Sequence, residues 1–111
     1  MSTITSTNPY TGEINATFET LTDEQLTQTI EKAHHAYLTR KNISKAEKKA
    51  LFFRLADLLD ERNDACALLE TREMGSLWSF SKNVIKGTAN LIRWNATNFE
   101  TVLADEPFDA E

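Results

Sequence analysis

The feature that most constrains the fold of this chain is a long amphipathic stretch between Ser44 and Gly75. Apolar residues recur in it at the three- and four-residue spacing of an α-helix. Ser44 and Glu47 have the spacing of a capping box, and Gly75 suits the left-handed conformation that often ends a helix. Because the stretch is long for one globular helix, we predict a kink near Asn63 and Asp64, which favour helix ends. Its apolar residues are Leu51, Leu55, Leu58, Leu59, Cys66, Leu69 and Met74.

A further helix is predicted on each side of this stretch. Thr22 and Gln25 form a second capping box, and the helical pattern after it continues to about Leu38. After Gly75, we expect Ser76 to cap a third helix that extends to about residue 103. The third helix carries one apolar stripe of Phe80, Val84, Leu91 and Trp94 and an adjoining stripe of Ile85, Ile92 and Phe99.

The residues before Thr22 predict strands. Residues 3–7 and 13–18 are short β-branched or alternating segments on either side of the sequence NPYTG at residues 8–12. Proline presets the first turn angle, and Gly12 accepts the positive φ that closes a bulged hairpin. We therefore predict a mainly α fold, in which a short N-terminal β-hairpin is followed by three helices, the second of them long and kinked.

Length and charge set the domain organisation and exclude one class of partner. The 111 residues are 41% hydrophobic and 26% charged, as in an ordinary globular protein, and this length suits a single domain. We expect residues 1–21 to form a hairpin arm, residues 22–103 a helical region and residues 104–111 a flexible acidic tail. The net charge of −5 opposes electrostatic binding to nucleic acid, so no nucleic acid partner is expected.

The chain has the sequence character of a cytoplasmic protein. Cys66 is its single cysteine, so no intrachain disulfide is possible and a reducing compartment fits. The N-terminus has no basic region followed by an apolar run, as a secretory signal would. No stretch approaches the ~18 apolar residues that a membrane span requires, so no membrane partner is expected.

No pattern in the chain predicts a catalytic, cofactor-binding or metal site. Glu31 and His34 have the Glu-x-x-His spacing of di-metal helical bundles, but those sites need a second such motif, which the chain lacks. His34 and His35 lie about 100° apart on a helix and cannot chelate one ion together. Cys66 is expected to be a buried core thiol. A phosphate-binding loop is excluded by the wide separation of the three glycines, Gly12, Gly75 and Gly87.

Five segments, in their order along the chain, resemble the start of aldehyde dehydrogenases. NPYTGE at residues 8–13 resembles the family's NP-x-TGE opening, and AHHAYL at residues 33–38 resembles part of its first helix. LADLLDER at residues 55–62 is similar to the family's LADLLEER run. LETREMG at residues 69–75 resembles its TxEMG signature, and LADEP at residues 103–107 its exit sequence. The succinate-semialdehyde dehydrogenase branch is the most similar, and the resemblance covers essentially the whole chain.

This resemblance implies the fold of the N-terminal part of the aldehyde dehydrogenase cofactor domain. It also implies an NAD(P)-dependent oxidoreductase that oxidises aldehydes to carboxylates, with NAD or NADP as the cofactor of full-length members. The family's nucleophilic cysteine, general-base glutamate and cofactor-binding lysine and glycine motif lie beyond the last residue, and Cys66 matches none of them. We therefore expect an N-terminal fragment, either a truncated gene product or a deliberate fragment, that is inactive and binds no cofactor on its own.

A small helical protein–protein interaction module is the alternative function. Two helices and a hairpin cover one stripe of the third helix, and leaving the second stripe in water forgoes about 1.5–3 kcal/mol per large side chain. That is a large share of the ~5–15 kcal/mol stability of a small domain. A second copy covers such a patch through two-fold symmetry. We therefore expect a homodimer through the third helix, with contacts from Ile85, Ile92, Trp94 and Phe99.

Overall fold

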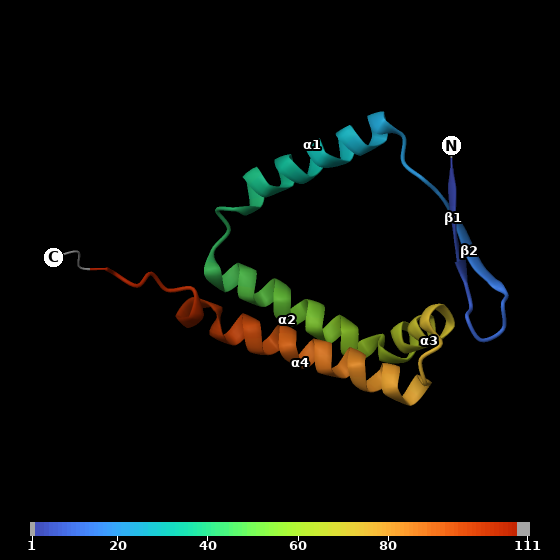
Figure 1. Cartoon of the computed structure of the whole chain (residues 1–111). Helices are drawn as coiled ribbons and strands as arrows, with labels where there is room; N and C mark the ends of the chain where they lie inside the picture. The colour runs from blue at the N-terminus through green and yellow to red at the C-terminus, as the bar shows by residue number, and fades with distance from the viewer. Residues whose placement is uncertain (1, 109–111) are drawn as a thin grey trace.

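The computed structural model describes residues 2–108 and shows, within that range, a two-stranded hairpin followed by four helices (Figure 1). The prediction of a mainly α fold with an N-terminal β-hairpin is confirmed. Residues 104–108 follow the last helix without regular secondary structure. Met1 and the last part of the predicted acidic tail, residues 109–111, lie outside the described residues. None of the helices described is long and apolar enough to cross a bilayer.

The hairpin pairs strand β1 (Thr3–Thr7) with strand β2 (Ile14–Glu19) in antiparallel register (Figure 1). Its turn is held by Asn8, whose Oδ1 accepts a hydrogen bond from the backbone N–H of Tyr10 at 2.9 Å. The N–H of Gly12 donates to the carbonyl of Asn8 at 2.8 Å, and Gly12 has a φ of 76°. The turn therefore needs glycine where the sequence provides it.

Helices α1 (Asp23–Arg40) and α2 (Lys45–Glu61) both begin at predicted caps. At α1, Thr22 Oγ1 accepts from the N–H of Gln25 at 3.2 Å, and Gln25 Oε1 accepts from the N–H of Thr22 at 2.9 Å. At α2, Ser44 Oγ accepts from the N–H three residues later at 3.1 Å. Each cap satisfies backbone donors that the helix itself leaves unpaired.

The predicted long second helix is two helices, α2 and α3 (Asn63–Met74). Arg62 separates them with φ −105° and ψ 15°, outside the helical region, and the chain changes direction there (Figure 1). The kink predicted near Asn63 and Asp64 is thus correct in position but is a full break. Asn63 explains it in part, because its Nδ2 donates to the backbone carbonyl of Lys82 at 3.0 Å and holds the start of α3 against the last helix.

Gly75 ends α3 in the left-handed conformation, with φ 71° and ψ 14°, as predicted. Helix α4 (Trp78–Val102) follows, but Ser76 does not cap it. The N-cap residue is Leu77, which makes no side-chain capping bond. The prediction for Ser76 was wrong because Leu77 is the extended residue at the turn, and its carbonyl accepts from the N–H of Ser81 at 2.9 Å.

Helix α4 lies antiparallel along α2 and α3, and the small core of the described residues is in this seam (Figure 1). At one end, Lys45 Nζ at the start of α2 lies 3.9 Å from Glu100 Oε2 near the end of α4. Small side chains let the helix backbones approach closely. The buried residues in the described range are Ala56, Ala67, Ser81, Ala89 and Ala96.

The two apolar stripes of α4 have the opposite roles from those predicted. Ile85, Ile92 and Phe99 share a helix face with buried Ala89 and are half-buried against the neighbouring helices. The expectation that the chain itself leaves this stripe uncovered is therefore wrong, because the small residues on the same face let α2 and α3 approach it. The exposed residues are those of the other stripe, namely Phe80, Val84, Leu91 and Trp94.

Helix α1 and the hairpin are largely separate from this seam. Helix α1 has no buried residue, and it lies away from α2 except near the connection between the two helices (Figure 1). The hairpin is tied to α3 by Ser6 Oγ, which donates to Glu73 Oε1 at 3.0 Å, and by Asn15 Nδ2, which donates to the carbonyl of Arg72 at 3.0 Å. The radius of gyration is 19.5 Å, against about 13 Å for a close-packed domain of about 100 residues. The described part is thus an open arrangement.

Candidate functional site

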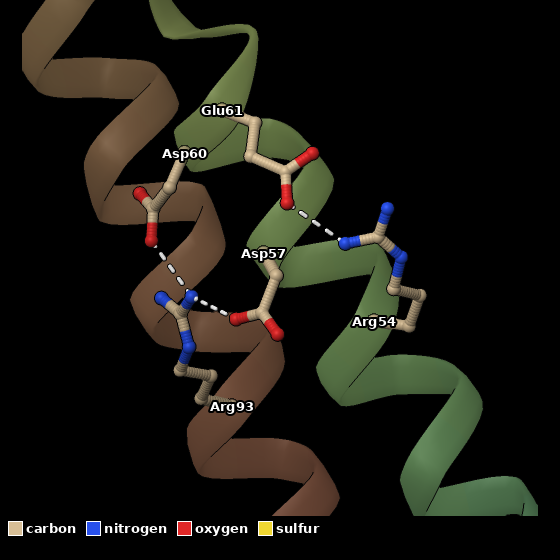
Figure 2. Close-up of polar contacts among 5 residues, drawn as sticks. All are labelled: Arg54, Asp57, Asp60, Glu61 and Arg93. Atoms are coloured by element: carbon tan, nitrogen blue, oxygen red, sulfur yellow. Dashed lines mark hydrogen bonds and ion pairs between the residues drawn. The ribbon is translucent and has the colours of Figure 1, made fainter.

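Two carboxylates of α2 bind one arginine of α4 (Figure 2). Arg93 Nη2 lies 2.7 Å from Asp57 Oδ1 and 2.7 Å from Asp60 Oδ2 (Figure 2). The hydrogen bond with Asp57, and then that with Asp60, raises the pKa of Arg93 above its ordinary value. On the outer side of α2, Arg54 Nη1 pairs with Glu61 Oε1 at 2.8 Å (Figure 2).

This cluster connects helices and has no features of a catalytic acid or base. An arginine with a raised pKa does not release its proton near neutral pH, so Arg93 cannot act as a base. Its side chain is 28% exposed, and both aspartates share its guanidinium. The pattern is that of a charge-assisted link between α2 and α4.

Near this cluster, a polar hollow of about 440 Å³ lies where α2 ends beside α4. Lys82 Nζ lies 2.7 Å from Asp64 Oδ1 and 4.6 Å from the centre of the Trp78 ring. The ammonium is therefore held by an ion pair and by a cation–π contact. Asn63 and Lys82 line this hollow, and the hydrogen bond from Asn63 Nδ2 to the backbone carbonyl of Lys82 fixes α3 against α4.

The histidine and cysteine positions carry no recognisable chemistry in the structure. His34 and His35 are both exposed on α1, with ring centres 6.4 Å apart. Within residues 2–108, no three His, Cys, Asp or Glu side chains converge as a metal site would require. Cys66 on α3 is half-buried, so the prediction of a fully buried core thiol was wrong; α3 packs mainly against α4, which covers only part of its surface.

An apolar groove lies where α1 turns into α2. It has a volume of about 550 Å³, within the range of small-molecule and peptide sites. We call it the elbow groove. It is lined by Tyr37, Ile43, Leu51, Phe52 and Leu55, with basic residues at its edge.

The sequence also matches a known protein family. Residues 1–110 match the aldehyde dehydrogenase family. The chain belongs to this family. It is 36% identical over 107 residues to succinate-semialdehyde dehydrogenase (NADP(+)) 1 of Mycobacterium bovis, and 33% identical over 108 residues to the protein of that name from Mycobacterium ulcerans. Each match covers 96% of this chain but only 23% and 24% of the relatives, so the chain spans about a quarter of their length.

Two solved structures contain the same arrangement of elements. A structure of Gox0499, described for cofactor and substrate selection, superposes on all of this chain with a TM-score of 0.91 and 28% identity, using 25% of its own length. Succinic semialdehyde dehydrogenase from Streptococcus pyogenes, in complex with NADP+ as the cofactor, gives 0.87 over 96% of this chain, with 26% identity and 24% of its own length. The open arrangement therefore occurs inside chains about four times as long.

Within the described residues, no glycine-rich turn leads from a strand into a helix. A pyrophosphate is bound by free N–H groups at a glycine-rich turn from a strand into a helix. At the starts of α1 and α2, Thr22 and Ser44 each accept from one of the helix N–H groups, whereas the start of α4 has no side-chain cap. Among the described glycines, Gly12 lies in the hairpin turn, Gly75 ends a helix, and Gly87 lies within α4.

The polar cluster and the elbow groove were both missed from the sequence. Asp57 and Asp60 are three residues apart and so share a face of α2, which is a visible signal. To predict that they bind Arg93, however, one must know the register with which α4 packs on α2. To predict the groove, one must know the angle between α1 and α2, for which the sequence contains no local signal.

Proposed function

We propose that this chain is the N-terminal, non-catalytic part of an NADP+-dependent aldehyde dehydrogenase that oxidises succinate semialdehyde or a closely similar aldehyde to its carboxylate. The support is the family match over residues 1–110, together with relatives named succinate-semialdehyde dehydrogenase (NADP(+)). The order of motifs, from NPYTGE to LADEP, supports the N-terminal position. The lone Cys66 supports a reducing, cytoplasmic location.

The contribution of this segment to such an enzyme is structural. The described residues contain one cysteine, the half-buried Cys66 on α3, and no glycine-rich turn from a strand into a helix, so we infer that the reacting groups come from elsewhere in the enzyme. The observation that carries this proposal is the exposure of large apolar side chains in an arrangement that longer family members share. We infer that the remaining three quarters of the enzyme cover these surfaces.

A chimeric enzyme tests the proposal. Residues 1–108 of this chain replace the matching segment of the Mycobacterium bovis relative, and NADPH formation from succinate semialdehyde is followed at its absorbance maximum. We expect a soluble enzyme with activity within about tenfold of the parent, because the segment supplies no reacting group. A folded chimera that has lost activity by a thousandfold or more would contradict a purely structural role. The parent lacking the segment is the control and should not fold.

The isolated chain is expected to be inactive and to bind neither NAD nor NADP. Calorimetric titration with each cofactor, and an aldehyde oxidation assay with succinate semialdehyde, check this directly. Micromolar binding of either cofactor would show that this segment has a nucleotide site of its own. The Streptococcus pyogenes enzyme, solved with NADP+, is the positive control.

The second candidate function, a helical interaction module that forms a homodimer, is supported by the exposed face of α4. We propose that its contacts come from the outer stripe, because Ile85, Ile92 and Phe99 already pack within the chain while Trp94 is 56% exposed. Gly87 has open space around it and leaves room for a partner helix. Sedimentation of the 111-residue chain should show at least twice 12.6 kDa, and Leu91→Glu should restore the monomer. A monomer at high concentration would rule this dimer out.

A further inference from the structure

Helix α1 carries an apolar stripe that the described residues leave uncovered. Leu26, Ile30, Ala33 and Tyr37 recur at the spacing that places them on one face of the helix. All four are exposed, Ile30 at 62% and Tyr37 at 61%. Within residues 2–108, no other helix or strand packs along α1. Since most helical stability in proteins comes from packing of the apolar face, α1 lacks its main source of stability in this part of the chain.

The stripe continues into the elbow groove. Tyr37 belongs to both, and the groove extends from it over Ile43 to Leu51, Phe52 and Leu55 of α2. The three residues of α2 are also exposed, although they are large and apolar. The stripe and the groove therefore form one continuous apolar surface across α1, the connection and α2. We call this surface the docking face.

The docking face has a basic edge at the groove. This edge is formed by Arg40 and Lys41 at the end of α1 and by Lys48 on α2. Lys41 Nζ lies 5.9 Å from the centre of the Tyr37 ring, so its charge lies close to the apolar floor. None of the three forms an ion pair with a carboxylate within residues 2–108. A complementary partner is therefore apolar in the middle and carries carboxylates at this edge.

Longer chains keep α1 in the same place. The Gox0499 structure superposes on all of this chain with a TM-score of 0.91, which requires α1 to have a similar position relative to α2. That chain is about four times as long. Because nothing among the described residues packs along α1, the contacts that hold it there come from the other three quarters of the chain.

We propose that the docking face binds the remaining three quarters of an aldehyde dehydrogenase chain and that this contact sets the angle between α1 and α2. Apolar side chains of that part cover the stripe from Leu26 to Tyr37, and its carboxylates face Arg40, Lys41 and Lys48. The inference rests on the proposed function, because it takes the partner from the same enzyme.

Hydrogen exchange in the chimeric enzyme described above tests the proposal. Mass spectrometry follows the peptides of α1 in the 111-residue chain and in the chimera with the Mycobacterium bovis relative. We expect the α1 amides to exchange at least about a hundredfold more slowly in the chimera, because opening of α1 there exposes a packed face. Equal exchange of α1 in a folded chimera would overturn the proposal.

Matched substitutions on α1 test which face is covered. Ile30→Asp places a charge in the stripe, and His35→Asp places one on the other side of the helix. In the chimera, Ile30→Asp should lower the melting temperature by about 5 °C or more beyond His35→Asp. If the Ile30→Asp chimera does not fold, Ile30→Ala against His35→Ala gives the same comparison. Equal effects at the two positions would show that the stripe stays in water and would overturn the proposal.

The isolated chain is the control for these substitutions. There, Ile30→Asp and His35→Asp should both leave the urea midpoint of the seam unchanged, because α1 does not pack on it. The fluorescence of Trp78 and Trp94, both on α4, follows this midpoint. A loss in the isolated chain equal to that in the chimera would mean that residues of this chain cover the stripe, and would contradict the proposal.

Charge reversal tests the basic edge. In the chimera, Lys41→Glu should lower the melting temperature by about 2 °C or more beyond Lys32→Glu, which makes the same change away from the groove. High salt should narrow this difference. Equal losses would contradict the carboxylates assigned to the partner.

The outcomes separate this inference from the proposed function. An active chimera in which α1 exchanges freely and tolerates Ile30→Asp would overturn the inference and leave the proposed function in place. A chimera that does not fold would contradict both.

Discussion

The ring of Pro9, in the hairpin turn, packs over Gly75 at the end of α3, so that a β-carbon at residue 75 would lie 3.1 Å from the proline Cγ. The same glycine has a φ of 71°, which side chains resist. Two independent restrictions therefore meet at one residue. The turn between α3 and α4 is therefore also the place where the hairpin contacts the helices.

Substitution of Gly75 should destabilise the chain. Gly75→Val is expected to lower the free energy of unfolding by about 1 kcal/mol or more, since the left-handed φ is strained for a β-branched residue and the Pro9 ring has to shift. Urea denaturation followed by circular dichroism measures the change. Gly75→Val combined with Pro9→Ala should recover part of the loss. An unchanged midpoint would mean that the joint has another conformation in solution.

Substitution of Gly87 by alanine should stabilise the chain, in contrast to substitution of Gly75. Gly87 lies within α4, and a β-carbon there meets no atom within 4 Å. Gly87→Ala should therefore raise the free energy of unfolding by about 0.5–1 kcal/mol through helix propensity alone. The same denaturation experiment measures it. A loss of stability would indicate that another chain packs closely against this residue.

Loss of Arg93 should weaken the pairing of α2 with α4. Arg93→Met keeps the aliphatic stem but leaves Asp57 and Asp60 as two like charges without their common partner. Its melting temperature should fall further than that of Arg54→Met, because Arg54 pairs within α2 and does not connect helices. Thermal unfolding at low and high salt compares the two variants, and salt should narrow the difference. Equal losses would mean that the link between the helices adds nothing.

The effect of Arg93 should not change with pH near neutrality. Its pKa is raised in the folded state, so the stabilisation is fully present below the ordinary arginine pKa and is lost only as the pH rises through the raised value. The difference in melting temperature between the parent chain and Arg93→Met should therefore be constant from pH 6 to pH 9. A difference that declines across this interval would point to another titrating group in the cluster.

The hydroxyl of Ser81 should be dispensable. Ser81 is fully buried, and its Oγ has no hydrogen-bond partner among the described residues. Ser81→Ala should leave stability unchanged or raise it by up to about 1 kcal/mol, because an unpaired polar atom is removed and alanine favours helix. Ser81→Val should lower it by about 1–3 kcal/mol, because the seam is too close for a larger side chain. A clear loss in Ser81→Ala would reveal a bound water or partner at this hydroxyl.

Features fixed by neighbouring residues could be predicted from the sequence, whereas features fixed by helix packing could not. The cap at Thr22 and the left-handed Gly75 depend on a few adjacent residues, and both are confirmed. The inner face of α4 was assigned wrongly because both of its stripes carry large apolar residues, and only the packing of α4 on α2 and α3 decides which stripe faces inward. In fact Ala89 and Ala96 mark the inner face, since small residues let the helices approach. The elbow groove depends on the angle between α1 and α2, which no local pattern specifies.

The separation of α1 and the hairpin from the seam has a consequence for how this chain unfolds. Unfolding of so open a structure exposes little additional apolar surface. The unfolding free energy should therefore depend only weakly on urea concentration. The heat capacity change should likewise fall below the ~1.2–1.5 kcal/mol/K of a compact domain of about 100 residues. With a small unfolding enthalpy, the thermal transition of the isolated chain should extend over a wide temperature range. Calorimetry would therefore record gradual melting where a full-length dehydrogenase gives a sharp peak.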